Sequence, residues 1–336
     1  MKTTILIVAG ILVSYLACGP LRVAKPQPQP AQSETAALQT TLDSLNATVN
    51  KLAARVSDLT PANPAIVTAT SLGCKADDPA FDNGPLIQTA LDKGLGVLLD
   101  SGGIYSTSPL RTKPGTASPI MGQSASFRHS PACRTGLTPF APNQTHVIEI
   151  AGQSPEGAGH GQVVRDLYIQ GTPACDGIRI HGGDAVSIEN VIIRGCKTAI
   201  AIKPTIRLYA CSIRGASLPG NDVGIQVENG TSVCCISVSG VVINVCRIGV
   251  NVNGWKRGLT LTGVVCEGAT EACCKFDDAK ASLIGCYLES TGDVPGIRSK
   301  GSKINVMDTS VRRISHDGGT QMNWIGDTVQ AGTLAY

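Results

Sequence analysis

The chain has 336 residues, a formal net charge of +3 and only 16% charged residues. This small charge, without a cluster of lysines and arginines, argues against a nucleic-acid-binding protein. Glycine is frequent at 38 residues and aromatic residues are scarce at 4%, which is typical of many short strands joined by tight corners.

Residues 1–18 form the first expected segment, MKTTILIVAGILVSYLAC. Lys2 precedes an apolar run, Ile5–Ala17, that is short for a membrane span and suits a signal sequence. Leu16-Ala17-Cys18 resembles a bacterial lipoprotein cleavage site, although Tyr15 stands where that pattern has leucine. The segment is either a signal or lipid anchor, or an uncleaved apolar plug that docks into a larger assembly.

Residues 19–32 are rich in proline and predict a stiff, extended linker. The next segment, residues 33–60, predicts an α-helical coiled coil. Its heptad seam consists of Leu38, Leu42, Leu45, Val49, Leu52, Val56 and Leu59. Valine at two a positions and leucine at d favour a dimer, but the e and g positions carry little charge, so a trimer remains open.

A repeat runs through the second half of the chain. Residues 186–202, VSIENVIIRGCKTAIAI, align with residues 236–252, ISVSGVVINVCRIGVNV. Related segments begin near Gln162, Ile206, Leu259, Ala281 and Ile304. Successive starting points are 20 to 30 residues apart, which is typical of one turn of a parallel β-solenoid. A β-sandwich also has many strands, but its strands would not repeat at this regular spacing.

The predicted fold class is therefore all-β, a right-handed parallel β-helix over residues 66–314 preceded by the coiled coil. Residues 315–336 are expected to be a C-terminal tail. GASLPGND, residues 215–222, predicts an outward loop at a corner.

Three acids, Asp77, Asp78 and Asp82, precede a predicted short helix over residues 84–93. Asn83 or Gly84 can cap this helix, and Pro85 suits its first position. Such a helix can cover the open end of the first solenoid turn. The acids are interpreted as shaping the turn into this cap, and the alternative is a bound cation.

The sequence LGCKADDPAFDNGPLIQTALDKGLGVLLDSGGIYSTSPL, residues 72–110, resembles the entry segment of the pectate-lyase-like β-helix superfamily. The matching positions are Gly73, Asp77, Asp82, the helix Leu86–Lys93, Gly103 and Tyr105. Asp100-Ser101 departs from the Leu-Pro that is usual in that family. A coiled coil joined to a β-helix resembles a phage tailspike or tail fibre, and that resemblance implies a virion protein, usually trimeric, that binds or cleaves surface polysaccharide.

Familiar catalytic phrases of the superfamily are missing from the sequence. Gly159-His160-Gly161 matches one polygalacturonase phrase, but it precedes the repeats and its partner phrases do not occur. No metal and no cofactor is therefore expected.

The repeat alignment places one polar residue per turn in an outward column: Gln170, Arg194, Arg214, Asn244, Glu267, Glu289 and Arg312. Glu267 and Glu289 fall on adjacent turns, a spacing that suits the acid and nucleophile of a retaining glycosidase. Arg194 and Arg214 could hold an anionic sugar. The alternative is a solvated ladder of balanced charges.

A neighbouring outward column is more apolar: Ile192, Ser212, Val242, Val265, Tyr287 and Ser310. Val242, Val265 and Tyr287 predict an interface between β-helices of an oligomer, and the alternative is coverage by a corner loop.

Thirteen cysteines, an odd number, leave at least one unpaired. The alignment puts Cys196 and Cys246 in one inward column with Ala216 between them, too far apart for a disulfide. Buried, unpaired thiols suit assembly in a reducing cytoplasm better than export.

Together these features predict a tail-fibre or tailspike-like virion protein that recognises host surface glycan. Its expected partners are further copies of itself, with a trimer favoured over a dimer, and a virion protein that docks its N-terminus. The alternatives are a secreted or lipid-anchored polysaccharide lyase or hydrolase of the same fold, and a purely structural fibre.

We expect light scattering to report an oligomer at micromolar concentration, because the heptad seam has no other apolar surface to cover it. A monomer under those conditions would contradict the predicted coiled coil. Intact mass separates the alternatives, since loss of residues 1–17 with a lipidated Cys18 would favour the exported protein.

Overall fold

The computed structural model describes residues 65–100, 102–123, 135–152, 161–230 and 233–326. These residues form a right-handed parallel β-solenoid of about eight turns, so the predicted all-β class and β-helix are confirmed. The predicted anchor, linker and coiled coil lie outside the described residues. No helix in the described ranges has both the length and the apolar character that a membrane crossing needs.

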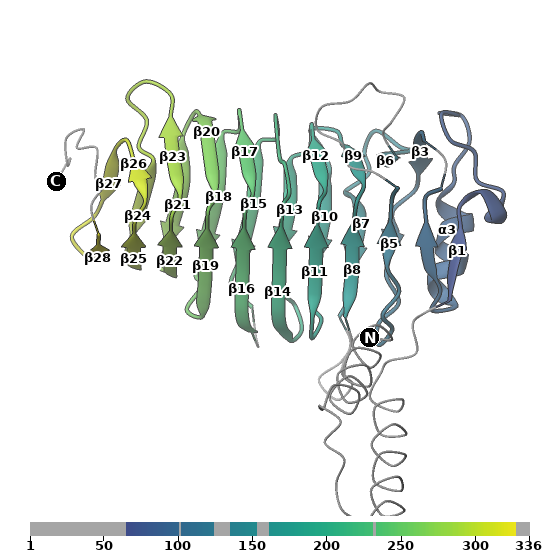
Figure 1. The fold of residues 1–336 in the computed structure, drawn as a ribbon, viewed down its shortest axis with the longest axis horizontal. Helices are drawn as coiled ribbons and strands as arrows, with labels where there is room; N and C mark the ends of the chain where they lie inside the picture. The colour runs from purple at the N-terminus through teal and green to yellow at the C-terminus, as the bar shows by residue number, and fades with distance from the viewer. Residues whose placement is uncertain (1–64, 101, 124–134, 153–160, 231–232, 327–336) are drawn as a thin grey trace, which may run out of the picture. The chain divides into compact units, whose positions relative to one another are not determined.

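Three walls of parallel strands make up the solenoid (Figure 1). The strands of the longest wall, sheet A, are β1 Ile66–Thr68, β2 Gly96–Leu98, β5 Ile120–Met121, β8 Gln162–Arg165, β11 Val186–Glu189, β14 Leu208–Arg214, β16 Val233–Ser239, β19 Gly258–Thr262, β22 Lys280–Ile284, β25 Lys303–Met307 and β28 Gln321–Ile325.

Sheet B, the second wall, has two four-stranded parts. Its strands are β3 Ile104–Thr107, β6 Gly136–Pro139, β9 Tyr168–Gln170 and β12 Ile192–Arg194, then β17 Val242–Asn244, β20 Val265–Ala269, β23 Tyr287–Ser290 and β26 Ser310–Val311. The strands of sheet C, the third wall, are β4 Leu110–Arg111, β7 His146–Ile150, β10 Asp176–Ile180, β13 Thr198–Ile202, β15 Val223–Glu228, β18 Ile248–Asn253, β21 Ala272–Asp277, β24 Ile297–Lys300 and β27 Ile314–His316.

Every step of the repeat can be compared with the register of sheet A. Gln162 pairs with Val186, and Ile236, Leu259, Ala281 and Ile304 pair in succession, so these predicted starting points are in register. The exception is Ile206, because Cys211 pairs with both Val186 and Ile236. The alignment was therefore five residues out of register at this one turn.

Correcting that turn changes the interpretation of residues 215–222. Ser217 bridges Ile192 and Val242 on the neighbouring turns, and Leu218 is fully buried. The segment is part of the wall that joins the two parts of sheet B, so the predicted outward loop was wrong. Asn221, rather than Ala216, lies between Cys196 and Cys246, and its side chain accepts a hydrogen bond from the Cys196 N–H at 2.9 Å.

From Asp166 onward, the corner of each turn between sheets A and B has a left-handed backbone. The residues in this column are Asp166, Asn190, Gly215, Gly240, Gly263, Gly285, Asp308 and Gly326, with φ between +44° and +90°. Each residue from Asp166 to Asp308 donates its backbone N–H to the next turn, as Gly263 does to the Ile284 carbonyl at 2.9 Å. Glycine, asparagine and aspartate are the residues that adopt this conformation at the lowest cost.

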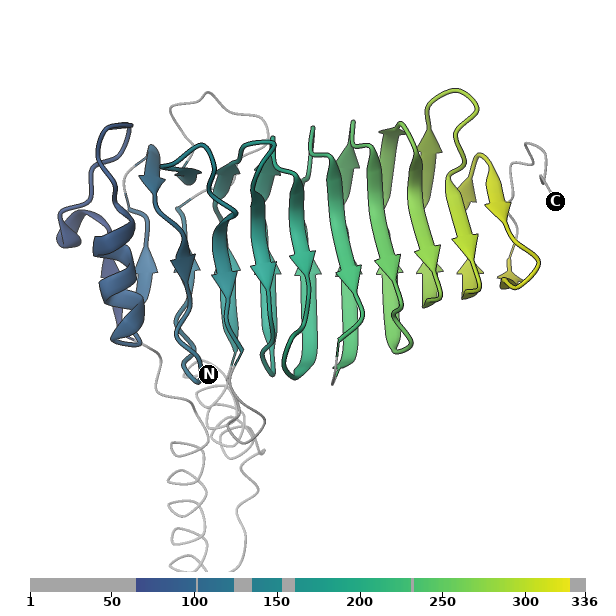
Figure 2. The same cartoon turned by 180° about the vertical axis from the view of Figure 1, so that it is seen from behind.

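Helix α3, Gly84–Asp92, covers the N-terminal end of the stack (Figure 2). Its buried face includes Ile87 and Leu91, both fully buried. Asn83 precedes the helix, but its side chain does not cap it. Instead, the Asn83 amide bonds to the backbone of Lys75 and to the Ser106 carbonyl, and so ties the entry segment to β3.

The acids of the entry segment accept hydrogen bonds from the backbone. Asp82 Oδ1 accepts the N–H groups of Gly84 and Ser108 at 2.9 and 2.7 Å. Asp77 Oδ1 accepts the N–H of Ile104 at 2.9 Å. These bonds hold the segment on the end of the solenoid, which is the structural role that the sequence suggested for the two side chains.

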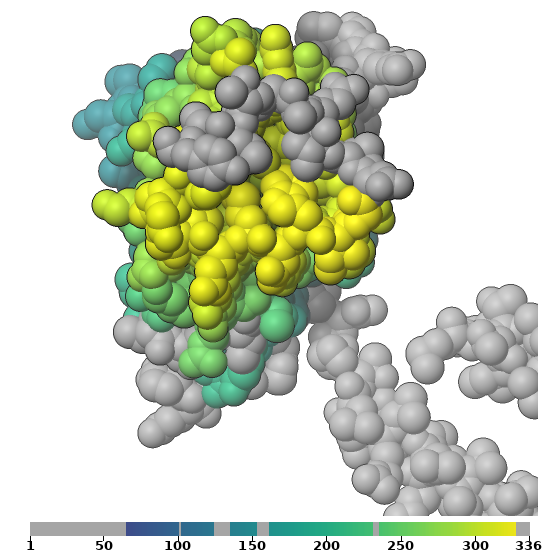
Figure 3. Space-filling view, turned by 90° about the vertical axis from the view of Figure 1, so that its left-hand side faces the viewer, coloured from purple at the N-terminus to yellow at the C-terminus, as the bar shows by residue number. Residues whose placement is uncertain are grey.

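The C-terminal end of the solenoid faces the viewer in Figure 3. Strand β28 pairs with β25, so the solenoid extends beyond residue 314, where the sequence placed the start of a tail. Trp324 and Ile325 of this last strand are 40% and 54% exposed. Ten cysteines of the described ranges are free, and eight of these ten are buried.

We predict that Gly263→Ala lowers the free energy of unfolding by about 1–2 kcal/mol, because alanine resists φ near +58° while open space surrounds its added methyl group. Urea denaturation measures the change. The control is Gly258→Ala, since Gly258 also has open space but no left-handed backbone. Equal effects of the two substitutions would contradict the role of the corner.

Candidate functional site

The structure places the two predicted catalytic carboxylates side by side on sheet B. Glu267 on β20 and Glu289 on β23 are cross-strand neighbours, and both are exposed. The Tyr287 hydroxyl donates a hydrogen bond to Glu289 Oε2 at 2.6 Å, and this bond raises the pKa of Tyr287. The pair therefore lies on adjacent turns, as the repeat predicted, with a tyrosine beside one member, and its catalytic role stays a prediction.

Only one of the two predicted arginines, Arg194, shares this column. Arg194 lies on sheet B opposite Gln170, three turns from Glu267. Arg214 lies on sheet A opposite Glu189, where it donates to the Ser212 hydroxyl at 2.8 Å. The register error therefore misplaced Arg214 alone, and the two arginines lie on different sheets and are not neighbours in one column.

The predicted apolar interface column is continuous from Val242 through Val265 to Tyr287. Tyr287 is 41% exposed and the two valines are partly exposed. Ser217, and not Ser212, occupies the preceding turn. The oligomeric role of this column stays a prediction.

A residue next to this column has an unfavourable backbone. Val245 follows β17 with φ +55° and is 70% exposed. A β-branched residue rarely adopts positive φ. The equivalent corners on the neighbouring turns contain Gly220 and Gly268.

A cluster of ionisable side chains that the sequence analysis missed lies on the outer face of sheet C. Glu149 on β7 is its centre. Arg111 Nε lies 3.0 Å from Glu149 Oε1, and the Nε2 atoms of His146 and His181 lie 3.8 and 3.5 Å from Oε2. One carboxylate thus contacts a guanidinium and two imidazoles.

The next turn adds a second acid and a second arginine. Asp176 and Arg179 on β10 are the cross-strand neighbours of His146 and Glu149. Arg179 Nε and Nη2 donate to Asp176 Oδ2 at 3.1 and 2.9 Å, and Nη2 also donates to the Thr145 carbonyl. The Asp176 side chain is only 4% exposed, so this pair is held rigidly beneath the cluster.

Burial lowers the pKa of His146, and the positive charge of Arg179 lowers it further, while Glu149 acts in the opposite direction. His146 is therefore neutral at pH 7 and can accept a proton. A neutral imidazole beside a carboxylate is an arrangement that general acid–base chemistry uses. In the described ranges no three histidine, cysteine or carboxylate side chains are placed to hold a metal ion.

The cluster could have been found from sequence by one signal. HVIEI at 146–150 and DGIRI at 176–180 both place polar side chains at their first and fourth positions. The repeat was recognised only from Gln162 onward, so the pairing of these two segments was not considered. His160, the other histidine of interest, lies outside the described residues.

No protein-family model matches the sequence, and no curated protein matches it either. Several solved structures are similar in fold. The enzymatically active domain of tailspike protein 2 from bacteriophage CBA120 has a TM-score of 0.59 and 14% identity, over 79% of this chain and 43% of that one. The chain has the parallel β-helix fold of phage tailspike proteins.

Two further solved structures are similar to the chain in fold. Full-length tailspike protein 2 from an Escherichia coli O157:H7 bacteriophage has a TM-score of 0.56 and 14% identity, covering 74% of this chain and 35% of that one. ORF18 of Geobacillus virus E2 has a TM-score of 0.51 and 14% identity, over 90% and 66%. The chain spans less than half the length of either tailspike structure, and the likeness concerns the fold alone.

We predict that the free energy of unfolding falls as the pH drops below about 6.5, and falls less in His146→Gln. The folded-state pKa of His146 is lowered from about 6.5, so the unfolded chain binds the proton first. The stabilisation is present above that value and is lost on acidification.

Urea denaturation at several pH values measures the effect. His316→Gln, outside the cluster on β27, is the control and should keep the wild-type pH dependence. An unchanged profile in His146→Gln would show that His146 does not titrate in this way.

Proposed function

We propose that the protein is a component of a phage tail that attaches the virion to polysaccharide on the host surface. The observation that carries the proposal is the tailspike fold, which covers most of the chain. The solenoid also supplies long outward faces on which polar side chains recur at the spacing of the turns, about 4.8 Å. Such a face suits an extended polymer with many similar units.

The oligomer and the docking of the N-terminus belong to the same proposal. The heptad seam at residues 38–59 and the apolar column at Val242, Val265 and Tyr287 support an oligomer, and the resemblance to tailspikes favours a trimer over a dimer. The segment before the seam would then dock into the virion, which places the protein on a tail appendage.

Cleavage of the bound polysaccharide is a second candidate function. It is favoured by the position of the Glu149 carboxylate within 4 Å of two imidazoles, one of which has a lowered pKa. In a hydrolase or lyase, the neutral His146 would accept a proton and Glu149 would orient or stabilise the charged imidazole. Glu267 and Glu289 form the competing site on sheet B.

We expect the labelled protein to bind bacterial cells that display a surface polysaccharide and not isogenic cells that lack it. Flow cytometry across a panel of strains measures the binding. Binding that is equal on stripped and polysaccharide-bearing cells would overturn the proposed attachment function.

For cleavage, release of reducing ends is compared in Glu149→Gln and in the double variant Glu267→Gln, Glu289→Gln. If sheet C is catalytic, Glu149→Gln slows release by about 100-fold or more, and the double variant acts as the folded control. If sheet B is catalytic, the result is reversed. Full activity in both variants would exclude both sites.

A further inference from the structure

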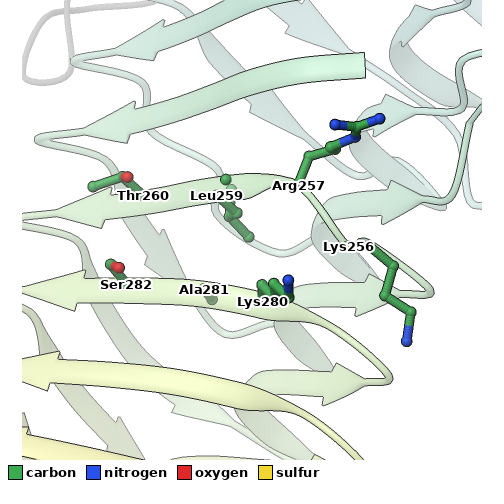
Figure 4. Close-up of a pocket in the computed structure, with 8 residues that line it drawn as sticks. Lys256, Arg257, Leu259, Thr260, Lys280, Ala281 and Ser282 are labelled. Atoms are coloured by element: carbon green, nitrogen blue, oxygen red, sulfur yellow. The ribbon is translucent and has the colours of Figure 1, made fainter. Parts of the chain in front are cut away.

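A shallow depression of about 160 Å³ lies on the outer face of sheet A, between β19 and β22 (Figure 4). Its lining includes Arg257, Gly258 and Thr260 from one turn and Lys280 and Ser282 from the next. Gly258 has no neighbouring atom within 4 Å of the position that a Cβ would take. The missing side chain therefore leaves the hollow open beside Arg257 and Lys280, which also line it.

Alternation along the strands gives the depression a charged end and a hydroxyl end. Leu259 and Ala281 point into the core and are buried, so Thr260 and Ser282 point outward. These two residues are cross-strand neighbours, and Figure 4 shows them side by side. Their hydroxyls can donate and accept hydrogen bonds.

The positive charge at the other end is not balanced by acids. Lys256 pairs with Asp278, but Arg257 and Lys280 form no ion pair with any residue that the structure describes. Lys303 is the direct cross-strand neighbour of Lys280. Like charges placed opposite each other destabilise a sheet, so this arrangement opposes folding unless an anion relieves it.

On sheet C, by contrast, the cationic side chains form ion pairs with acids. Arg247 is paired with both Asp222 and Glu271, and Glu271 also contacts Lys275 and Arg298. The same solenoid can thus match acids to bases turn by turn. Unmatched cations beside an open depression on sheet A point to an anion supplied from outside the chain.

We propose that this depression binds an acidic sugar unit that carries a carboxylate. The planar guanidinium of Arg257 suits a carboxylate, Lys280 adds a second positive charge, and Thr260 and Ser282 suit the ring hydroxyls. The inference rests on the proposed polysaccharide attachment and adds an acidic glycan and a second face, sheet A, to it.

Saturation-transfer difference NMR with glucuronate tests the site, and glucose serves as the neutral probe. We expect transfer to glucuronate and much weaker transfer to glucose. Arg257→Gln and Lys280→Gln should each weaken glucuronate affinity by about tenfold, because each removes a charge-assisted contact.

Arg165→Gln is the matched control, since it removes one positive charge from an exposed position on β8 of the same sheet. It should leave the affinity for glucuronate unchanged. Lys280→Gln should also raise the melting temperature without ligand, because it relieves the repulsion from Lys303; this shows that its weaker binding is not a folding defect. Equal transfer to glucose and glucuronate, or wild-type affinity in both pocket variants, would overturn the proposal.

The cell-binding measurement separates this inference from the attachment function. Binding to polysaccharide-bearing cells with no transfer to glucuronate would refute the acidic-sugar site and leave attachment standing. Transfer to glucuronate that depends on Arg257 and Lys280, with no preference for polysaccharide-bearing cells, would support the site and refute attachment.

Discussion

Hydrogen bonding between successive turns is the interaction on which the rest of this structure depends. A single turn cannot bury its apolar residues, so each turn is stable only when its backbone is in phase with its neighbours. The corner between sheets A and B keeps successive turns in register. Residues such as Asn190, Gly240 and Gly285 adopt a left-handed backbone there and donate their backbone N–H groups to the following turn. Because one residue makes this corner, an insertion there would shift every later contact.

Stacking of the turns also determines which side chains become neighbours on the surface. Residues one turn apart become direct neighbours, so the sheet brings Glu267 beside Glu289 and Lys280 beside Lys303. Opposite charges would serve folding better at both places, as Glu149 beside Arg179 does. The needs of folding therefore do not explain why like charges occupy these neighbouring positions.

Periodicity made most of the fold predictable. The alignment of Val186 with Ile236 is correct, because both pair with Cys211 of the turn between them. The turn between them was misplaced because Ile206 and Cys211 both open plausible apolar alternations, and only the long-range pairing selects Cys211. The sheet C cluster was missed for the same physical reason, since His146 and Glu149 acquire their partners only when β7 stacks on β10.

The two ends of the solenoid are unequal. Helix α3 covers one end, whereas β28 has a partner strand on one side only within the described residues and exposes Trp324 and Ile325. In a linear stack, each turn opens most easily when one neighbour is missing. Loss of structure should therefore advance as a zipper from β28 toward α3, so the order of the turns along the chain also gives the order of their amide protection.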